Sequence, residues 1–272
     1  MNAYSNPAAY WESRLSAHFD LTGTGYAALG PHYNRRMYQA RLRALEKALV
    51  ETGQMLTGSR VLEVGCGSGF YAEYCARQGV ADYIGVDITS ISVARLQQRY
   101  PHFRFVQADI AQAQFDLGAD FDVALAADVL FHIIDDEAFG AAIGNIVSQL
   151  KRGGLFIASD IFPDATTQTA PHCRSRSHDD YRAHFSRWGM RVLHVEPIFA
   201  ILQPPPIVPN VAWPWRGYAR LWHYGWRLAR RMPLDRLLPS PLDWLDRHVF
   251  LPRWGSRAPN NKWLLAVKDN VA

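Results

Sequence analysis

Between Arg60 and Asp160, short apolar runs alternate with segments long enough to form helices. The apolar runs are RVLEV, YIGVD, FRFVQAD, FDVALAAD and GLFIASD. Short strands separated by helix-length segments are typical of βαβ units, and their continuous apolar character indicates a parallel sheet that is buried on both faces. With RVLHVEPIFAIL and KWLLAVKD as further strands, the sequence predicts an α/β fold. Its core is a doubly wound, mostly parallel, Rossmann-like sheet of seven strands.

The same pattern divides the chain into four segments. Residues 1–56 form an N-terminal helical lid segment, in which RRMYQARLRALEKALVETG predicts a long helix that stops at Gly53. Residues 57–202 form the core, and residues 262–272 supply its last strand. Between them, residues 203–261 form a helical insertion that is rich in Pro, Trp and Arg.

Composition and charge exclude several classes of protein. At 272 residues, 49% of them hydrophobic, the chain is long enough to bury a large core. It contains no apolar run of membrane-spanning length, and its first residues lack the layout of a secretory signal, so we expect it in the cytoplasm. A net charge of +4 does not by itself indicate nucleic acid as a partner, and we expect none.

The cysteines do not form a pattern. The chain has three, with no CxxC pair and no histidines at metal-ligand spacing. We therefore expect free thiols and no bound metal. They are Cys66, Cys75 and Cys173.

A glycine-rich loop follows the first strand of the core. The segment VLEVGCGSGF runs from an apolar strand through three alternating glycines, Gly65, Gly67 and Gly69. Glycines allow a tight turn and a close backbone approach to a ligand, and the following helix offers unpaired N–H groups at its N-terminus. The loop is therefore predicted to hold a nucleotide-like ligand.

The residues around the loop argue against a dinucleotide. A dinucleotide fingerprint has the spacing GxGxxG, but Phe70 stands at the position of its third glycine. Glu63 would also place a carboxylate where a pyrophosphate lies, and two anions repel each other. A carboxylate next to an ammonium or sulfonium group is favourable instead.

Two further carboxylates lie at strand ends. Asp87 ends the second strand in GVD, where an acidic side chain accepts hydrogen bonds from ribose hydroxyls, and Asp109 ends the third strand in QAD. Because the carboxyl ends of parallel strands share one edge, these carboxylates and Glu63 converge on one crevice.

The ordered set VLEVGCGSG, GVDIT, QADI, FDVALAADVLFHI and LKRGGLFIASD resembles the class I S-adenosylmethionine-dependent methyltransferases, over Arg60 to Asp160 and the final strand. The resemblance implies an enzyme that binds S-adenosylmethionine and transfers its methyl group. It implies that the loop from Gly65 to Gly69 surrounds the methionine part of the cofactor. The implied cofactor-binding residues are Glu63, Gly65, Cys66, Gly67, Gly69, Asp87, Ile88, Asp109, Ile110 and Asp128.

Within this set, Asp87 is expected at the ribose, and Asp109 with Ile110 at the adenine. Asp128 is expected beside the cofactor, and Cys66 as a small residue that fills the loop. Tyr10 and Trp11 resemble the aromatic start of methyltransferases whose N-terminal segment folds over the cofactor. The alternative for this pair is packing of a helix against the sheet.

Methyl transfer to a hydroxyl group is faster when a general base takes its proton, and three residues are candidates for this base. His132 follows the fourth strand in DVLFHIIDD, and a structural role in closing the cofactor site is the alternative. Asp160 ends the fifth strand, where it either acts as the base or caps the strand. His172 lies on the loop TTQTAPHCRSRSHDDY, expected to be irregular.

Three residues are candidates for contact with the acceptor. Arg174 and Arg176 lie on the same loop and are suited to bind a carboxylate, a phosphate or sugar hydroxyls, unless the loop is merely solvated. Tyr33 either lines the lid or packs in the core.

The insertion is aromatic and basic. Six of the nine tryptophans lie between Ala212 and Gly255. If WRGYARLWHYGWRLARRM is a helix, its large apolar residues share one stripe and its arginines lie opposite. Three interpretations stay open: a lid over the substrate, a subunit contact, and peripheral contact of residues 213–232 with the inner membrane surface. Tryptophans at a lid also suit stacking on sugar rings.

These features lead to a main interpretation and two alternatives. The main one is methyl transfer to a hydroxyl group of a small molecule, namely a sugar, glycan or glycolipid. The first alternative is a quinone-like or lipid acceptor at the membrane. The second is a regulator or assembly partner that binds S-adenosylmethionine without turnover. The sequence does not decide the oligomeric state.

Overall fold

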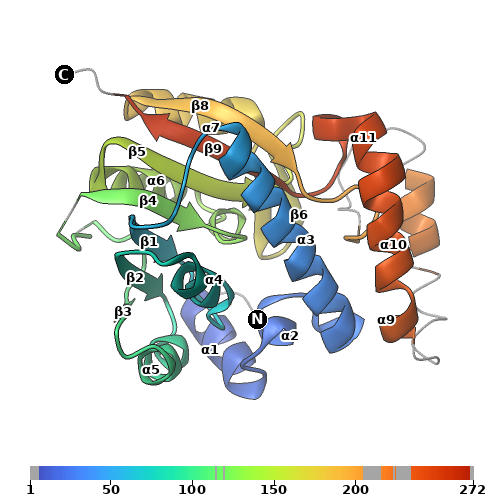
Figure 1. The fold of residues 1–272 in the computed structure, drawn as a ribbon, viewed down its shortest axis with the longest axis horizontal. Helices are drawn as coiled ribbons and strands as arrows, with labels where there is room; N and C mark the ends of the chain where they lie inside the picture. The colour runs from blue at the N-terminus through green and yellow to red at the C-terminus, as the bar shows by residue number, and fades with distance from the viewer. Residues whose placement is uncertain are drawn as a thin grey trace.

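The computed structural model of the chain describes residues 6–113, 115–118, 120–204, 216–222, 224 and 234–269. It contains a central sheet with helices on both faces (Figure 1). The seven strands follow the order β3-β2-β1-β4-β5-β9-β8, in which β9 runs antiparallel to both of its neighbours and the first five pair in parallel. This confirms the predicted doubly wound fold. The strands are β1 (Arg60–Val64), β2 (Asp82–Asp87), β3 (Arg104–Gln107), β4 (Phe121–Ala126), β5 (Leu150–Asp160), β8 (Met190–Pro197) and β9 (Lys262–Lys268).

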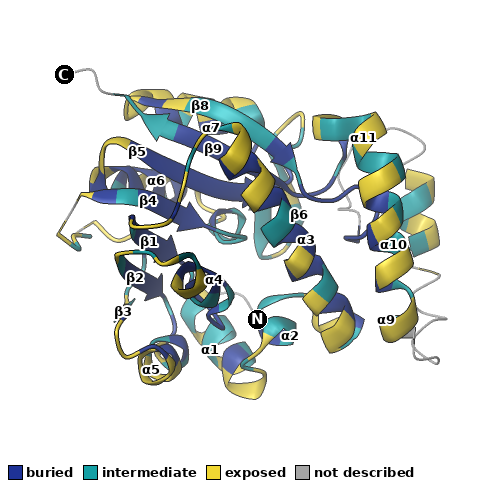
Figure 2. Ribbon diagram, viewed as in Figure 1, coloured by how far each residue is buried: buried dark blue, intermediate teal, exposed yellow. Residues whose placement is uncertain are grey.

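Alternating side chains on the strands build two cores, one on each face of the sheet. Val61 packs into the core under α3 (Gly30–Glu51), α4 (Phe70–Gln78) and α5 (Ser90–Arg99), whereas Leu62 packs into the core under α6 (Asp136–Gln149) and α7 (His178–Arg187). Figure 2 shows the strands buried between helices whose outer sides are exposed. Because the strand order reverses between β1 and β4, a crevice opens at their carboxyl ends.

The N-terminal segment lies next to that crevice. Its helix α1 (Pro7–Ala17) is tied to the start of α5, because the carboxylate of Glu12 accepts from the backbone N–H of Ser90 at 2.7 Å and of Ile91 at 3.2 Å. The side chain of Arg14 donates to the carbonyl oxygens of Gly23 and Gly25, which fixes α1 to α2 (Leu21–Thr24). A 3-10 turn, η1 (Ala27–Leu29), then leads into α3.

The loop expected after the fifth strand contains a hairpin. Its strands β6 (Thr167–Ala170) and β7 (Cys173–Ser175) are antiparallel, with Pro171 and His172 at the turn. The turn rests on a short 3-10 helix, η2 (Leu130–His132), that follows β4. The predicted irregular segment is therefore partly ordered as a two-stranded ribbon, for which a proline at the bend is suited.

The described part of the insertion is mostly helical. Its elements are α9 (Leu234–Leu237), α10 (Pro239–Leu245), the π-helical turn η3 (Asp246–Phe250), α11 (Leu251–Trp254) and η4 (Gly255–Arg257), and residues 216–222 are helical as well. Asp246 anchors this unit to the core, because its carboxylate accepts from the backbone N–H of Ile201 at 2.7 Å and of Leu202 at 2.9 Å. Several residues of the predicted stripe and its basic face lie outside the described residues. These are Trp215, His223, Trp226, Arg227, Ala229 and Arg230.

In the part of the chain that the structure describes, no helix combines the length and the apolar character needed to cross a membrane.

Candidate active site

A cavity of about 580 Å³ lies at the carboxyl ends of the parallel strands. Helix α1, the glycine loop and η2 form its walls together with the strand ends. The predicted residues on its wall are Trp11, Glu63, Gly65, Cys66, Gly67, Asp87, Ile88, Asp109, Ile110, Asp128 and His132. The glycine loop and the strand ends where the strand order reverses therefore line the same cavity.

The glycine loop is packed too closely for side chains. Gly65 and Gly67 have φ angles of +73° and +50°, in the left-handed region. A Cβ atom on Gly65 would lie 2.2 Å from a methyl carbon of Val129, and one on Gly67 would lie 2.8 Å from a methyl carbon of Thr24. Gly69 also has a left-handed φ angle, but it is the N-cap of α4 and does not lie on the cavity wall.

Asp87 holds the loop in place. Its carboxylate accepts from the backbone N–H of Gly67 at 2.8 Å and from that of Thr89 at 2.9 Å, so it joins β2 to the loop. Burial raises the pKa of Asp87, while these hydrogen bonds oppose the rise. Asp87 therefore stabilises the glycine loop and also lies on the cavity wall, where a ligand would bind.

Glu63 is buried on the floor of the cavity. Burial raises the pKa of Glu63 to about 8, and the nearby Asp87 adds to the rise. The hydroxyl group of Tyr83 donates a hydrogen bond to the carboxylate, which lowers the pKa and opposes the rise. The carboxyl group is then mostly protonated at neutral pH. A positively charged ligand at this position would stabilise the ionised form.

The other loop and strand-end residues shape the wall. Burial keeps the thiol of Cys66 protonated by raising its pKa, which agrees with a filling role. Asp109 accepts from the backbone N–H of Ala111 at 2.9 Å, and Ile88 and Ile110 add apolar surface beside it.

Asp128 is the centre of a polar network. Its carboxylate accepts from Ser159 Oγ at 2.7 Å and from Asn261 Nδ2 at 2.8 Å, and a guanidinium nitrogen of Arg41 lies 2.6 Å away. Arg41 is buried in α3 and was not among the predicted site residues. A signal existed: Arg41 shares one helical stripe with the buried Met37 and Leu45, where a charged residue requires a partner.

Two buried donors next to this network have no hydrogen-bond partner among the residues that the structure describes. They are Nε of Arg41 and the hydroxyl group of Tyr71, which lies on the cavity wall. Buried polar groups are nearly always hydrogen-bonded in folded proteins, so such a pair indicates a site for a polar or anionic group of a ligand. Thr24, Tyr38 and Ser68 also line the cavity and were not predicted.

His132 lies between the cavity and the β6–β7 turn. Its Nδ1 is 3.0 Å from the carbonyl oxygen of His172, and the two imidazole rings are stacked at 5.6 Å with an interplanar angle of 7°. Burial lowers the pKa of His132 to about 4, so its ring is neutral. Donation from Nδ1 to the carbonyl makes Nε2 the basic nitrogen.

The aromatic residues of α1 pack on these histidines. Trp11 lies edge-on to His132 with ring centroids 5.0 Å apart, and Tyr10 lies 5.7 Å from His172. Trp11 is on the cavity wall, whereas Tyr10 and His172 are not.

Asp160 does not reach the cavity, which corrects its assignment as a candidate base. The side chain is fully buried, and its carboxylate accepts from the backbone N–H of Ile161 at 2.7 Å and from the hydroxyl group of Tyr181 at 3.3 Å. Burial raises its pKa to about 6. The hairpin packs over the end of β5, so the position is a buried strand end.

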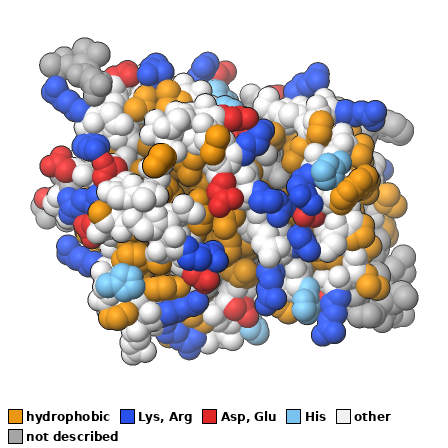
Figure 3. Space-filling model, in the orientation of Figure 1, with side chains coloured by type: hydrophobic (Ala, Val, Ile, Leu, Met, Phe, Trp, Pro, Cys, Tyr) orange, Lys and Arg blue, Asp and Glu red, His pale blue; other side chains and the backbone are white. Residues whose placement is uncertain are grey.

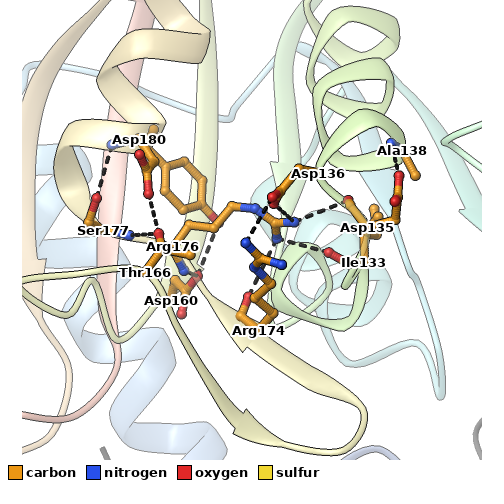
Figure 4. A network of polar contacts seen from close by, with 11 residues as sticks. Ile133, Asp135, Asp136, Ala138, Asp160, Thr166, Arg174, Arg176, Ser177 and Asp180 are labelled. Atoms are coloured by element: carbon orange, nitrogen blue, oxygen red, sulfur yellow. Dashed lines mark hydrogen bonds and ion pairs between the residues drawn. The ribbon is translucent and has the colours of Figure 1, made fainter. Parts of the chain in front are cut away.

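The two arginines of the hairpin have structural partners, as Figure 4 shows. The guanidinium group of Arg176 is buried, donates to the carbonyl oxygen of Ile133 at 2.8 Å and lies 3.8 Å above the ring of Phe139. Arg174 pairs with Asp136 at 2.8 Å. Both residues fasten the hairpin to the start of α6 and are absent from the cavity wall, so we correct their assignment to the acceptor.

Tyr33 is also away from the cavity. It is fully buried, donates to the carbonyl oxygen of Leu202 at 2.6 Å and packs edge-on against Trp222. Of the two interpretations from the sequence, the structure places Tyr33 in the core, between α3 and the insertion.

The comparisons with known proteins agree with this geometry. Residues 61–154 match the family model of the methyltransferase domain. The ubiquinone biosynthesis O-methyltransferase of Bradyrhizobium sp. (strain ORS 278) is 33% identical over 108 residues, which are 39% of this chain and 41% of that protein. The protein of the same name from Brucella ovis is 37% identical over 109 residues, 39% of this chain and 42% of that protein. The chain therefore spans about two fifths of the length of these curated relatives.

Solved structures share the fold at low sequence identity. The magnesium protoporphyrin IX methyltransferase from Synechocystis PCC 6803 aligns with a TM-score of 0.57 at 17% identity, over 97% of this chain and 98% of that one. An S-adenosylmethionine-dependent methyltransferase from Mesorhizobium loti aligns with a TM-score of 0.52 at 17% identity, over 82% and 97%. Residues 61–154 therefore match a methyltransferase domain, within a fold that this chain shares with S-adenosylmethionine-dependent methyltransferases.

Proposed function

We propose that this chain transfers the methyl group of S-adenosylmethionine to a hydroxyl oxygen of a small acceptor with a quinone-like, phenolic ring. Relatives with 33% and 37% identity are named ubiquinone biosynthesis O-methyltransferases, which favours the quinone-like alternative over the sugar, glycan or glycolipid acceptor. The observation that carries the proposal is that one cavity joins the glycine loop to an apolar wall that contains His132.

The cavity suits S-adenosylmethionine at each of its polar positions. Asp87, on the cavity wall, would accept from the ribose hydroxyls, and Ile88, Asp109 and Ile110 would contact the adenine ring. The hydroxyl group of Tyr71, which lies on the cavity wall and has no partner among the described residues, is suited to the carboxylate of the methionine part. Glu63 would offset the positive charge of the same ligand.

The remaining wall suits a flat apolar acceptor. Trp11, Leu15, Val129, Ile133 and Ile134 line the cavity together with His132. A sugar would need many more polar partners, because each buried hydroxyl group without one costs about 1–3 kcal/mol. A phenolic ring needs one polar contact, at the oxygen that is methylated.

Bound here, S-adenosylmethionine supplies a methyl group that is activated by its sulfonium centre. The protein's own part would mainly be to hold the acceptor oxygen and this methyl group in position, with the residues proposed for the cofactor on one side and the apolar wall on the other. Nε2 of His132 accepts the hydroxyl proton, and the hydrogen bond from Nδ1 to the carbonyl of His172 fixes the tautomer. Trp11, in α1, closes the wall next to His132.

The test is methyl transfer from radiolabelled S-adenosylmethionine to a panel of acceptors, with cofactor binding measured separately by calorimetry. We expect binding, and transfer to hydroxylated quinols and catechols but not to sugars. Transfer to sugars alone would overturn the acceptor class. Binding without transfer to any acceptor, including lysate fractions, would favour the non-catalytic regulator.

We further propose that the insertion makes peripheral contact with an anionic membrane surface, where a lipid-linked acceptor would lie. Leu221 and Tyr224, within the segment predicted to touch the membrane, are exposed, as are Leu237 and Trp244. Figure 3 shows Lys and Arg side chains gathered over α3 and the helices of the insertion. Apolar side chains among basic ones are typical of interfacial binding.

Cosedimentation with vesicles tests this contact. We expect binding to vesicles that contain phosphatidylglycerol and weaker binding to neutral vesicles, with Trp244→Ser and Leu237→Ser reducing it further. Equal binding to both kinds of vesicle, or none to either, would contradict the proposal. Met55→Ser, at an exposed apolar residue outside both the insertion and the cavity wall, is the control.

A further inference from the structure

Three side chains of types that can bind a metal ion meet beside the cavity. The ligand atoms of His132, His172 and Cys173 lie within 4.8 Å of one another, although forty residues separate the first two. The turn of the β6–β7 hairpin brings them together by resting on η2. The sequence contains no metal-ligand spacing, because these three residues come together only through the hairpin. That segment was expected to be an irregular loop.

The chemistry of this set favours a zinc-like ion. A thiolate and two imidazoles are typical zinc ligands, and three protein ligands leave one position for water. Another group of possible ligands, Glu51, His194 and Glu196, is less suited, because the ammonium group of Lys47 already lies 2.8 Å from Glu196 and 3.6 Å from Glu51.

The orientation of His132 connects the two sites. Its Nδ1 is 3.6 Å from Sγ of Cys173, so Nδ1 is the nitrogen that faces the group of ligands. The same Nδ1 lies 3.0 Å from the carbonyl oxygen of His172. Only one of these two interactions, coordination of a metal or donation to the carbonyl, is available to Nδ1 at a time.

We propose that His132, His172 and Cys173 form a Zn²⁺ site whose occupancy switches off methyl transfer. When zinc binds, Cys173 gives its thiol proton to solvent, and the hydrogen of His132 moves from Nδ1 to Nε2 as Nδ1 coordinates the ion. Nε2 then carries a hydrogen and no longer accepts the proton of the acceptor hydroxyl group. The inhibitory part of this proposal rests on the proposed function, whereas the metal site does not.

Binding is tested without any turnover. Metal-free protein is titrated with Co²⁺, whose bond to a thiolate gives a charge-transfer band in the near ultraviolet. We expect a band that saturates at one equivalent of Co²⁺ and that is lost in Cys173→Ser. In His172→Ala, the affinity of the protein for Co²⁺ should fall at least tenfold. The control His178→Ala, a histidine outside the group, should keep it. No band in the wild type, or an unchanged band in Cys173→Ser, would overturn the site.

Inhibition is tested in the methyl-transfer assay. We expect Zn²⁺ to abolish transfer by the wild type and a chelator to restore it. Cys173→Ser should keep its basal activity and require at least ten times more Zn²⁺ for inhibition. Stimulation by Zn²⁺, or equal inhibition of both proteins, would overturn the inhibitory role. If no acceptor is ever methylated, the proposed function fails while the cobalt titration still decides the metal site.

Discussion

A guanidinium nitrogen of Arg41 lies 2.6 Å from the carboxylate of Asp128, and this ion pair ties helix α3 to the carboxyl end of β4. Asp128 has a φ angle of +57°, a conformation that L residues rarely adopt. The pair, together with Ser159 and Asn261, therefore fixes a strained position on the cavity wall.

Replacing this arginine tests the network. Arg41→Met removes one partner of a buried pair and leaves Asp128 insufficiently compensated, so we expect a loss of about 3 kcal/mol in the free energy of unfolding. Urea denaturation measures it. Arg35→Met, at an exposed position of the same helix, should change stability by less than about 0.5 kcal/mol. Equal effects of the two variants would contradict a structural role for the pair.

Asp87→Ala should weaken the binding of S-adenosylmethionine while the fold persists. Loss of hydrogen bonds from the ribose to a carboxylate corresponds to about 3 kcal/mol, or about 100-fold in Kd. Because the carboxylate also accepts from Gly67 and Thr89, we expect some loss of stability as well. Calorimetry gives the Kd and circular dichroism checks the fold. Asp82→Ala, at the other end of β2, is the control, and an unchanged Kd for Asp87→Ala would refute the assignment.

His132→Ala should reduce turnover more than affinity. Removal of a general base lowers kcat by about 100-fold, whereas KM for both substrates should change less than about threefold. Steady-state kinetics with a chelator present separates the two parameters. The exposed His102→Ala is the matched control. Normal turnover by the His132 variant would show that the base lies elsewhere.

Glu63 should make the stability of the ligand-free protein depend on pH. Its pKa is about 8 in the folded chain, above its ordinary value of 4.5, so the native state holds a proton that the unfolded chain has lost. Its contribution to stability is complete below about pH 4.5, falls as the pH rises, and is lost above about pH 8. Urea denaturation of the wild type and of Glu63→Gln at pH 5, 7 and 9 isolates this contribution. A constant difference between the two proteins would contradict it.

The hairpin arginines should affect stability and not acceptor binding. Arg176→Ala removes a buried guanidinium group that contacts a carbonyl oxygen, a carboxylate and an aromatic ring. This change should lower the free energy of unfolding by about 3 kcal/mol. Arg174→Ala breaks a partly exposed ion pair, which is worth at most about 1 kcal/mol. KM for the acceptor should stay unchanged in both. A large rise in KM for either variant would restore the original assignment to the substrate.

The parts of the site that the sequence predicted are those that follow from local pattern. The alternation of apolar runs predicted a mostly parallel sheet of seven strands, and Gly65, Gly67, Asp87 and Asp109 each stand at or just after a strand end. Their common position at one edge is a consequence of parallel strands, which requires no knowledge of tertiary contacts.

The errors arose where long-range packing decides the outcome. Asp160 also ends a strand, but a hairpin that follows it covers the position. Arg176 and Tyr33 have residue types that suit a ligand, yet their partners lie in α6 and in the segment before the insertion. Arg41 meets Asp128 across 87 positions of the chain. Its place on a buried helical stripe indicates that it needs a partner, but no local pattern identifies Asp128 as that partner.

A crystal structure of the chain grown with S-adenosylhomocysteine tests the cofactor site most directly. We expect the ligand in the cavity between α1 and the glycine loop, with its ribose on Asp87, its carboxylate near Tyr71, and its sulfur facing the wall that holds His132. A cavity without ligand at saturating concentration, or a ligand bound elsewhere on the protein, would contradict it.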